Sequence, residues 1–483
     1  TLELIRRGLV VGIQDLGAGG ISCPTSEMTS KAKTGIAIDL DRVHRREPGM
    51  EPFEVMISES QERMLAVVAP EDVDEVLGVC TRWGLEARVI GEILELDRVE
   101  VRADGRVVAD VPADALAEEG PVYDRPMRPP EWLTEVRNAP RGDDPPRDLA
   151  AAFRAVLAAP NICSKRWVWE QYDHMIFLGT LIGPGGDAAV VRLPDHDVAV
   201  AITTDGPGRF CYLDPYEGAR LAVCEAAVNV ACTGARPLAI TNCLNFGNPE
   251  KPGVMWQFAE VIRGMSDACI ALATPVTGGN VSFYNETNGR AIYPTPVIGM
   301  LGVLEDPRAA RGLGFSREGD RIVLLGTTDP GAFGGSEFAK VVHGAVGGLP
   351  PAVSLDAAVR LVRFLSDTDL PLVSAHDLSA GGLAIALTES AVKGAAGFTL
   401  EAQLDGAPHQ WMFAESPSRA LVSCLPTDVD DVMRRADAAG VPAQVVGTVG
   451  GDSLHFGAFA VALQEADAIY EGALQSLLSS SIG

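Results

Sequence analysis

The sequence predicts a multidomain protein of α+β and α/β structure that contains a duplicated domain. Its 483 residues are too many for one hydrophobic core and correspond to about three or four domains. A segment near the start of the chain recurs near its end, which is typical of duplication. Between the two copies, strand-like and helix-like patterns alternate, as expected for helices packed on a sheet.

The composition favours a globular protein and argues against several partners. Hydrophobic residues make up 47% of the chain, and 51 glycines with 32 prolines predict many turns. No apolar run approaches the roughly 18 residues of a membrane helix, and the first residues lack a secretory signal. We therefore expect a cytoplasmic protein without a membrane partner. The net charge of −26 would repel phosphate backbones, so nucleic acid is not an expected partner.

The repeat consists of two colinear blocks. VGIQDLGAGGISCPTSEMTSKAKTG, from Val11, aligns without a gap with VSAHDLSAGGLAIALTESAVKGAAG, so that Asp15 corresponds to Asp377 at an offset of 377 − 15 = 362. VMISESQERMLAVVAPEDVDEV then matches WMFAESPSRALVSCLPTDVDDV, which pairs Glu59 with Glu415 at an offset of 415 − 59 = 356. Two blocks in the same order indicate duplication of a whole domain.

The two copies differ in what precedes them. Before Asp377 the sequence predicts a strand from Ile322, a Gly-rich turn (GAFGGSEF) and an amphipathic helix from Leu355. Before Asp15 only about ten helix-like residues remain. We therefore expect the first copy to be truncated, with its opening half cut off or supplied by another chain.

Four segments follow from these patterns. Residues 1–120 are predicted to be the remainder of the first copy, and residues 121–176 a Pro-rich connector with a linker helix. Residues 177–306 combine strands (VAVAITTD, PLAITNCLNF, TPVIGMLGVL) with two Ala-rich helices and predict a complete mixed domain. Residues 307–483 are the second copy.

A glycine pair in the mixed domain is a candidate phosphate contact. The chain has no G-x-x-x-x-G-K-[ST] motif, so a nucleotide site would work without a P-loop lysine. In ATPVTGGNVSFYNET, Gly279 would let the backbone approach a phosphate, Asn280 offers an amide oxygen to Mg²⁺, and Ser282 offers a hydroxyl. The alternative is a plain turn between two strands.

Polar residues in the repeat form the second group of candidates. Asp15 follows an apolar run and precedes a Gly-rich, helix-starting turn, which suits a Mg²⁺–phosphate group. Helix capping by Asp15 and Asp377 is the alternative. The second copy replaces Gln61 by Pro417, so the first copy is the better candidate for substrate and the second for a structural role. Glu59, Ser60 and Gln61 otherwise form an exposed turn, and Asp205 in TTDGPG caps or packs a helix.

Taken together, QDLGAGG, SESQER, NICSKRWVWEQYDH, TTDGPG, TGARPLAITNCLNFGNPEKP, TGGNVSFYNET and HDLSAGGLA resemble the motif series of the synthetase subunit of phosphoribosylformylglycinamidine synthase, in its small form. The resemblance extends over essentially all of the chain. It implies membership of a superfamily that includes aminoimidazole ribonucleotide synthetase. It also implies tandem copies of a ferredoxin-like domain followed by a mixed α/β domain, arranged with pseudo-twofold symmetry.

The resemblance further implies an activity in purine biosynthesis. ATP, with Mg²⁺, would phosphorylate the amide of formylglycinamide ribonucleotide, and ammonia would displace phosphate to form the amidine. Ammonia would come from a separate glutaminase subunit, with a small bridging subunit. The family's catalytic histidines are expected upstream of Thr1, in the missing N-terminal half, so no catalytic residue is assigned here. The alternatives are another superfamily kinase or synthetase, or a non-catalytic nucleotide-binding scaffold.

Carried over residue by residue, the resemblance implies four groups of site residues. The ATP contacts are Asn242 and Gly279; the metal ligands are Asp15 and Asn280; the substrate contacts are Glu59, Ser60, Gln61 and Ser282; and the auxiliary nucleotide site consists of Asp205, Asp377, Glu415 and Ser416.

Overall fold

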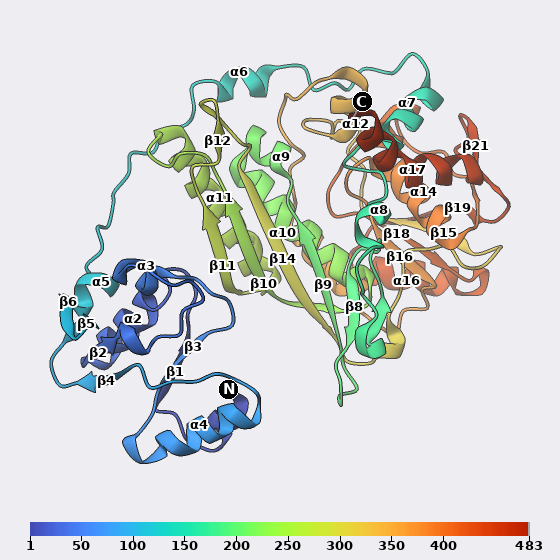
Figure 1. Ribbon diagram of the computed structural model, residues 1–483. Coiled ribbons are helices and arrows are strands. Elements are labelled where there is room, and N and C mark those ends of the chain that lie inside the picture. Colours follow the sequence, from blue (N-terminus) through green and yellow to red (C-terminus); the bar gives the residue numbers. More distant parts are fainter. Residues whose placement is uncertain (482–483) are drawn as a thin grey trace. The chain divides into compact units, whose positions relative to one another are not determined.

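The computed structural model describes residues 1–481 and divides the chain into two compact units (Figure 1). Unit 1 comprises Thr1–Asp124, and unit 2 begins at Arg125. Each unit is described by itself below. None of the described helices is both long enough and apolar enough to cross a membrane.

Unit 1 contains the first copy of the repeat. Its strands form a two-stranded sheet, β1-β3, and a four-stranded sheet of order β4-β2-β5-β6. In chain order the elements are α1 (Leu2–Arg6), β1 (Gly12–Asp15), α2 (Ser22–Ala32), β2 (Gly35–Asp39), η1 (Leu40–Arg42), α3 (Pro52–Ile57), β3 (Met64–Val67), η2 (Pro70–Asp72), α4 (Val73–Arg82), β4 (Gly91–Leu94), β5 (Arg98–Ala103), β6 (Arg106–Pro112) and α5 (Ala113–Ala117).

The first part of unit 2 holds the connector and the mixed domain. A six-stranded sheet of order β11-β10-β14-β9-β8-β7 forms its centre. The elements are α6 (Leu133–Asn138), α7 (Leu149–Leu157), α8 (Arg166–Trp169), η3 (Ile176–Leu178), β7 (Thr180–Ile182), β8 (Ala189–Arg192), β9 (Ala199–Asp205), α9 (Gly208–Leu213), α10 (Pro215–Cys232), β10 (Arg236–Asn245), α11 (Pro252–Leu272), β11 (Val276–Ser282), β12 (Glu286–Thr287), β13 (Arg290–Ala291), β14 (Thr295–Leu304) and η4 (Pro307–Ala309).

The second copy of the repeat completes unit 2. Its seven-stranded sheet has the order β16-β18-β15-β19-β17-β20-β21, so β15 pairs with both β18 and β19. The elements are β15 (Arg321–Leu325), α12 (Glu337–His343), α13 (Leu355–Leu365), β16 (Ser374–Asp377), α14 (Gly382–Gly394), β17 (Phe398–Leu400), α15 (Pro408–Phe413), β18 (Ala420–Cys424), η5 (Pro426–Asp428), α16 (Val429–Ala438), β19 (Ala443–Val449), β20 (Ser453–His455), β21 (Ala460–Ala462) and α17 (Leu463–Ser481).

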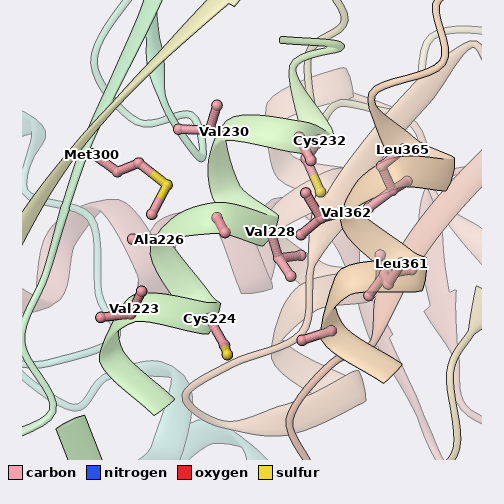
Figure 2. Packing of buried hydrophobic residues seen from close by; sticks show 14 of the residues in the cluster. Val223, Cys224, Ala226, Val228, Val230, Cys232, Met300, Leu361, Val362 and Leu365 are labelled. Carbon is pink, nitrogen blue, oxygen red and sulfur yellow. The ribbon is translucent and has the colours of Figure 1, made fainter. Parts of the chain in front are cut away.

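Helix α10 joins the mixed domain to the second copy. Its small and branched side chains are buried on nearly every side, whereas a surface helix keeps one polar face. Figure 2 shows Val223 and Val230 on the side of Met300 from β14, while Cys232 lies toward Val362 of α13. The segments 177–306 and 307–483 therefore share one hydrophobic core, although the sequence distinguishes them as two domains.

Candidate functional site

A cavity of about 320 Å³ lies in unit 2, between α10 and the loops of the second copy. Two residues predicted for the auxiliary nucleotide site, Asp377 and Glu415, line it. The other polar or charged lining residues are Asn161, Arg209, Glu225, Glu337, Ser379, Ser418 and Arg419. The volume lies at the lower end of the roughly 300–1,000 Å³ typical of small-molecule pockets.

Carboxylates gather on this cavity and directly beside it because four different elements end or pass there. Asp377 ends β16, Asp205 ends β9, and Glu225 projects from α10. Glu415 follows α15, and its Oε1 accepts hydrogen bonds from the backbone N–H groups of Gly381, at 2.7 Å, and Glu337, at 2.8 Å. The result is an acidic cluster that is largely shielded from water.

Burial changes the ionisation of this cluster. It raises the pKa of Asp205, Asp377 and Glu415 to about 7 each, and the repulsion between neighbouring carboxylates adds to the shift for Asp205 and Asp377. Burial also raises the pKa of Glu225 well above its ordinary value. At neutral pH such a cluster takes up protons or a cation, because several adjacent negative charges are unfavourable in a low-dielectric site.

A buried histidine next to the cluster balances part of this charge. His376 Nδ1 lies 2.6 Å from Asp187 Oδ1, and Nε2 lies 3.1 Å from Glu389 Oε2. Burial alone lowers the pKa of His376, but the two carboxylates raise it well above its ordinary value. The imidazole is therefore a cation held between acids.

The same corner contains a candidate metal-ligand group. One ligand atom each from Asp187, His376 and Asp377 lies within 4.8 Å of the others. Mg²⁺ prefers oxygen ligands, and the imidazole nitrogens of His376 already bond to carboxylates. The chemistry of this group therefore fits a divalent cation held by Asp187 and Asp377 rather than by the histidine.

The predicted auxiliary residues take unequal positions. Asp205 lies close enough to Asp377 for that carboxylate to raise its pKa, and Asp205 Oδ1 accepts from Asn229 Nδ2 at 2.9 Å. Ser416 does not line the cavity: its Oγ accepts from Asp329 N at 2.8 Å and donates to Asp329 O at 3.1 Å. Ser416 thus holds a loop beside the cavity.

The charged residues that sequence reasoning missed here include Asp187, Arg209 and Glu225. Glu225 and Asn229 are four residues apart on α10 and so lie on the same face of the helix, in a stretch that is otherwise apolar from Leu221 to Cys232. A polar pair at this spacing in a buried helix was the available signal. Asp187 lies in the loop before β8 and Arg209 in the first turn of α9, and neither shows such a pattern.

The residues predicted to contact ATP lie on neighbouring strands. Asn242 on β10 pairs with Gly279 on β11 in parallel register. A Cβ atom on Gly279 would lie 2.2 Å from Asn242 Oδ1, so a side chain there would displace the amide. Gly279 and Asn280 lie inside β11, so the interpretation of this segment as a plain turn is wrong. Asn280 is exposed, with Nδ2 3.8 Å from Cys243 Sγ.

Ser282, the third predicted residue of this strand, ends β11. Its Oγ lies 3.3 Å from Asn285 Oδ1. Ser282 pairs with Asn245 across the same parallel register as Asn242 and Gly279. The structure thus brings Asn242, Gly279, Asn280 and Ser282 to adjacent strands at one edge of the sheet.

The remaining predicted residues lie together in unit 1. Asp15 ends β1 opposite Met64, so it lies beside the loop that carries Glu59, Ser60 and Gln61. Glu59 Oε1 accepts from the backbone N–H of Gly19 at 3.1 Å, and all four predicted residues are exposed.

The helix-capping interpretation of Asp15 and Asp377 is wrong. Helix α2 has Ile21 at its N-cap and α14 has Gly381, and neither N-cap position shows a side-chain capping bond. Both aspartates end a strand instead, at the start of the Gly-rich turn. Their carboxylates therefore remain available to ligands in the first copy and join the buried cluster in the second.

Two protein-family models match the chain in this arrangement. The model of the AIR synthase related protein, N-terminal domain, matches residues 185–304. The model of the AIR synthase related protein, C-terminal domain, matches twice, at residues 1–104 and 317–457, which together are more than half of the chain. The double match coincides with the internal repeat.

Two proteins with high sequence identity to this chain have the same name. The phosphoribosylformylglycinamidine synthase subunit PurL of Moorella thermoacetica is 50% identical over 457 residues, which cover 94% of this chain and 62% of that protein. Its counterpart from Thermobifida fusca is 46% identical over 503 residues, covering 99% of this chain and 65% of that protein. The chain thus spans less than two thirds of the length of these relatives.

Solved structures agree with the sequence matches. Thermotoga maritima PurL complexed with FGAR superposes with a TM-score of 0.68 at 27% identity, covering 93% of this chain and 63% of that one. The same protein complexed with ATP gives a TM-score of 0.67 at 27% identity, with 93% and 65% covered. The chain therefore belongs to the AIR synthase related protein family and, within it, is of the PurL type.

Proposed function

We propose that this chain acts in phosphoribosylformylglycinamidine synthase, an ATP-dependent, amidine-forming ligase of purine biosynthesis. The whole protein would convert formylglycinamide ribonucleotide, ammonia and ATP into formylglycinamidine ribonucleotide, ADP and phosphate. The observation that carries the proposal is the 50% identity to a PurL subunit along 94% of this chain. Identity at this level, over almost the whole chain, supports a shared fold.

For nucleotide binding, we assign Asn242 and Gly279 to ATP. The missing side chain at Gly279 leaves the backbone of β11 open to a phosphate, and Asn242 presents an amide directly beside it. Asn280 and Asp15 supply amide and carboxylate oxygens suited to Mg²⁺. When bound, Mg²⁺ would neutralise phosphate charge during phosphoryl transfer.

For the ribonucleotide, we assign Glu59, Ser60, Gln61 and Ser282. The loop of Glu59–Gln61 presents a carboxylate, a hydroxyl and an amide to solvent, a set that can accept from or donate to ribose hydroxyls and amides. Glu59 is oriented by its bond from Gly19 N at 3.1 Å. This polar, exposed set contrasts with the second copy, where Pro417 replaces Gln61.

We assign the cavity of unit 2 to a magnesium-bound nucleotide that does not react. Asp205, Asp377 and Glu415 belong to this auxiliary site, with Ser416 holding its wall. Burial raises the pKa of each of the three carboxyls to about 7, and a divalent metal would favour their charged forms. Arg209 on the cavity wall suits the phosphates.

The partners are part of the proposal. We infer that ammonia reaches the whole protein from a separate glutaminase subunit, with a small bridging subunit in the assembly. A solved structure described as PurLQS from Thermotoga maritima, with a TM-score of 0.67 and 27% identity, supports an assembly of this kind.

The test is substrate-dependent ADP release. The whole protein is incubated with ATP, Mg²⁺ and ammonium, with and without formylglycinamide ribonucleotide, and ADP is quantified. Release should require the ribonucleotide. Gly279→Ala should lower kcat/KM for ATP by roughly 10-fold or more, because its Cβ would strike Asn242. Gly278→Ala is the matched control, since a Cβ there meets nothing within 4 Å. ADP release that is independent of the ribonucleotide would contradict the proposal.

A further inference from the structure

An arginine closes the loop that carries Glu59, Ser60 and Gln61. Arg63 Nε donates to Ser60 O at 3.2 Å, and Nη2 donates to Ser58 O. The side chain is partly buried, and burial lowers the pKa of its guanidinium. Its donors are thus directed at the backbone of the loop rather than toward solvent.

The second copy contains the same arrangement. Arg419, which corresponds to Arg63, donates from Nε to Ser416 O at 2.9 Å and from Nη2 to Ala414 O at 2.6 Å. These carbonyls belong to the counterparts of Ser60 and Ser58. The contact has therefore survived duplication, even though Gln61, which directly follows the anchored carbonyl of Ser60, has become Pro417.

The backbone of the loop explains why an arginine is needed. Glu62 has a φ of 65° and its counterpart Ser418 a φ of 58°, both in the left-handed region that non-glycine residues rarely adopt. Such a turn persists only when its surroundings hold it. A planar guanidinium reaches two carbonyls at once, whereas the ammonium of a lysine is a single point of charge.

We infer that Arg63 is a positioning residue for the ribonucleotide site, an inference that rests on the proposed function of Glu59, Ser60 and Gln61. By tying the carbonyls on both sides of Glu59, the guanidinium keeps the Glu59 carboxylate against Gly19 N and holds the backbone next to the exposed Gln61, whose Nε2 donates to Glu59 O at 3.4 Å. Arg63 acts through the loop and does not itself contact the ribonucleotide.

The experiment uses the whole protein with Arg63→Ala, Arg63→Lys and, as a matched control, Arg106→Ala. Arg106 is an exposed arginine of the same unit, far in sequence from the loop. Because a displacement of about 1 Å in a positioning group can lower a rate 100-fold, Arg63→Ala should raise KM for the ribonucleotide by roughly 10-fold or more. KM for ATP should stay within about 2-fold. Millimolar guanidinium should partly restore Arg63→Ala, and Arg63→Lys should remain impaired because it cannot bridge two carbonyls.

A second measurement separates this inference from the proposed function. Hydrogen exchange of the amides of residues 58–62 should be faster in Arg63→Ala than in the wild type, with the remainder of unit 1 and Arg106→Ala unchanged. Unchanged exchange in this loop overturns the inference, whatever the activity. An unchanged KM for the ribonucleotide, or an equal loss for both substrates, also overturns it. Absence of ribonucleotide-dependent ADP release in the wild type contradicts the proposed function instead.

Discussion

The two copies of the repeat fold alike locally but differ in their sheets. In the second copy, β15 lies between β18 and β19 and joins all strands into one seven-stranded sheet. The counterparts of β18 and β19 in the first copy are β3 and β4, and no strand of residues 1–124 lies between them. With no counterpart of β15 among residues 1–124, the strands of the first copy form two separate sheets.

The difference in burial follows directly. Every residue of β18 is buried, whereas Met64 on β3 and Ile93 on β4 are 46% and 44% exposed. The Gly-rich turn, the Glu59–Gly19 bond and the Arg63 contacts nevertheless match those of the second copy. Short-range hydrogen bonds can hold a loop by themselves, but a sheet needs its central strand.

The largest expected difference in stability between the copies concerns Arg63 and its counterpart Arg419, which hold the corresponding loops. Arg419 is 1% exposed and also donates to Thr328 Oγ1 at 3.1 Å. Arg419→Met would leave buried carbonyls unpaired and should lower the free energy of unfolding by about 3–5 kcal/mol. Arg63→Met, at a partly solvated site, should lower it by about 1 kcal/mol. Urea denaturation followed by circular dichroism measures both, and equal effects would show that the two sites are energetically alike.

The next largest effect on stability is expected when His376 is replaced by glutamine, the residue at the corresponding position, Gln14, of the first copy. His376→Gln should lower stability by about 2–4 kcal/mol, because Asp187 would stay buried without its cation. The folded-state pKa of His376 is raised, so its contribution is fully present below about pH 6.5 and is lost as the pH rises through the folded-state value.

Melting temperatures at pH 6 and pH 9 test this linkage. The wild type should gain more than His376→Gln at the lower pH. Gln14→His, the reciprocal change in the first copy, is the control: Gln14 already bonds to Glu27 at 2.7 Å, so its effect should stay within about 0.5 kcal/mol. A wild type and His376→Gln variant with the same pH dependence would contradict the assignment of charge to His376.

Two glycines should behave alike in both copies. Gly20 and Gly382 have φ values of 57° and 66°, and an added Cβ would lie 2.4 Å from Ser58 O and 2.8 Å from Ala414 O, respectively. Substitution by alanine should cost about 2 kcal/mol at each position. Gly84→Ala, at a φ of 68° with open space around it, should cost about 1 kcal/mol and isolates the backbone effect. Thermal unfolding of the three alanine variants measures these losses of stability. If Gly20→Ala and Gly382→Ala lose no more stability than Gly84→Ala, the added Cβ atoms do not clash with the carbonyl oxygens.

The smallest expected effect is electrostatic. The raised pKa of about 7 of Asp377 means that the folded state binds its proton more tightly, so stability is greatest at low pH and falls as the pH rises through about 7. Asp377→Asn should therefore stabilise the protein at pH 8 by about 1 kcal/mol and abolish stabilisation by Mg²⁺. Exposed Asp15→Asn should change the unfolding free energy by less than about 0.5 kcal/mol. The free energy of unfolding is measured at pH 8 with and without Mg²⁺. If Mg²⁺ still stabilises Asp377→Asn, Asp377 is not a ligand of the metal.

Local patterns in the sequence predicted much of the fold. The alternating segment TPVIGMLGVL is β14, whose residues alternate between buried and half-buried, and the amphipathic segment from Leu355 is α13. The alignment pairs Asp15 with Asp377 and Glu59 with Glu415, and the paired residues have corresponding positions or contacts in the structure. This is expected because duplicated turns keep the same short-range hydrogen bonds. The grouping of Asp377, Glu415 and Asp205 around one nucleotide site remains a proposal, although the structure brings these residues near one cavity.

By itself, the sequence determined the secondary-structure elements, the duplication and the polar loops, since these depend on neighbours within a few residues. Only the tertiary structure decided that α10 is shared by two domains, that Glu225 and Asp187 join the acidic cluster, and that the strands of the first copy pair as two separate sheets. It also decided the ionisation of the cluster. Burial and the distance between charges set pKa values, and both arise from residues far apart in the chain.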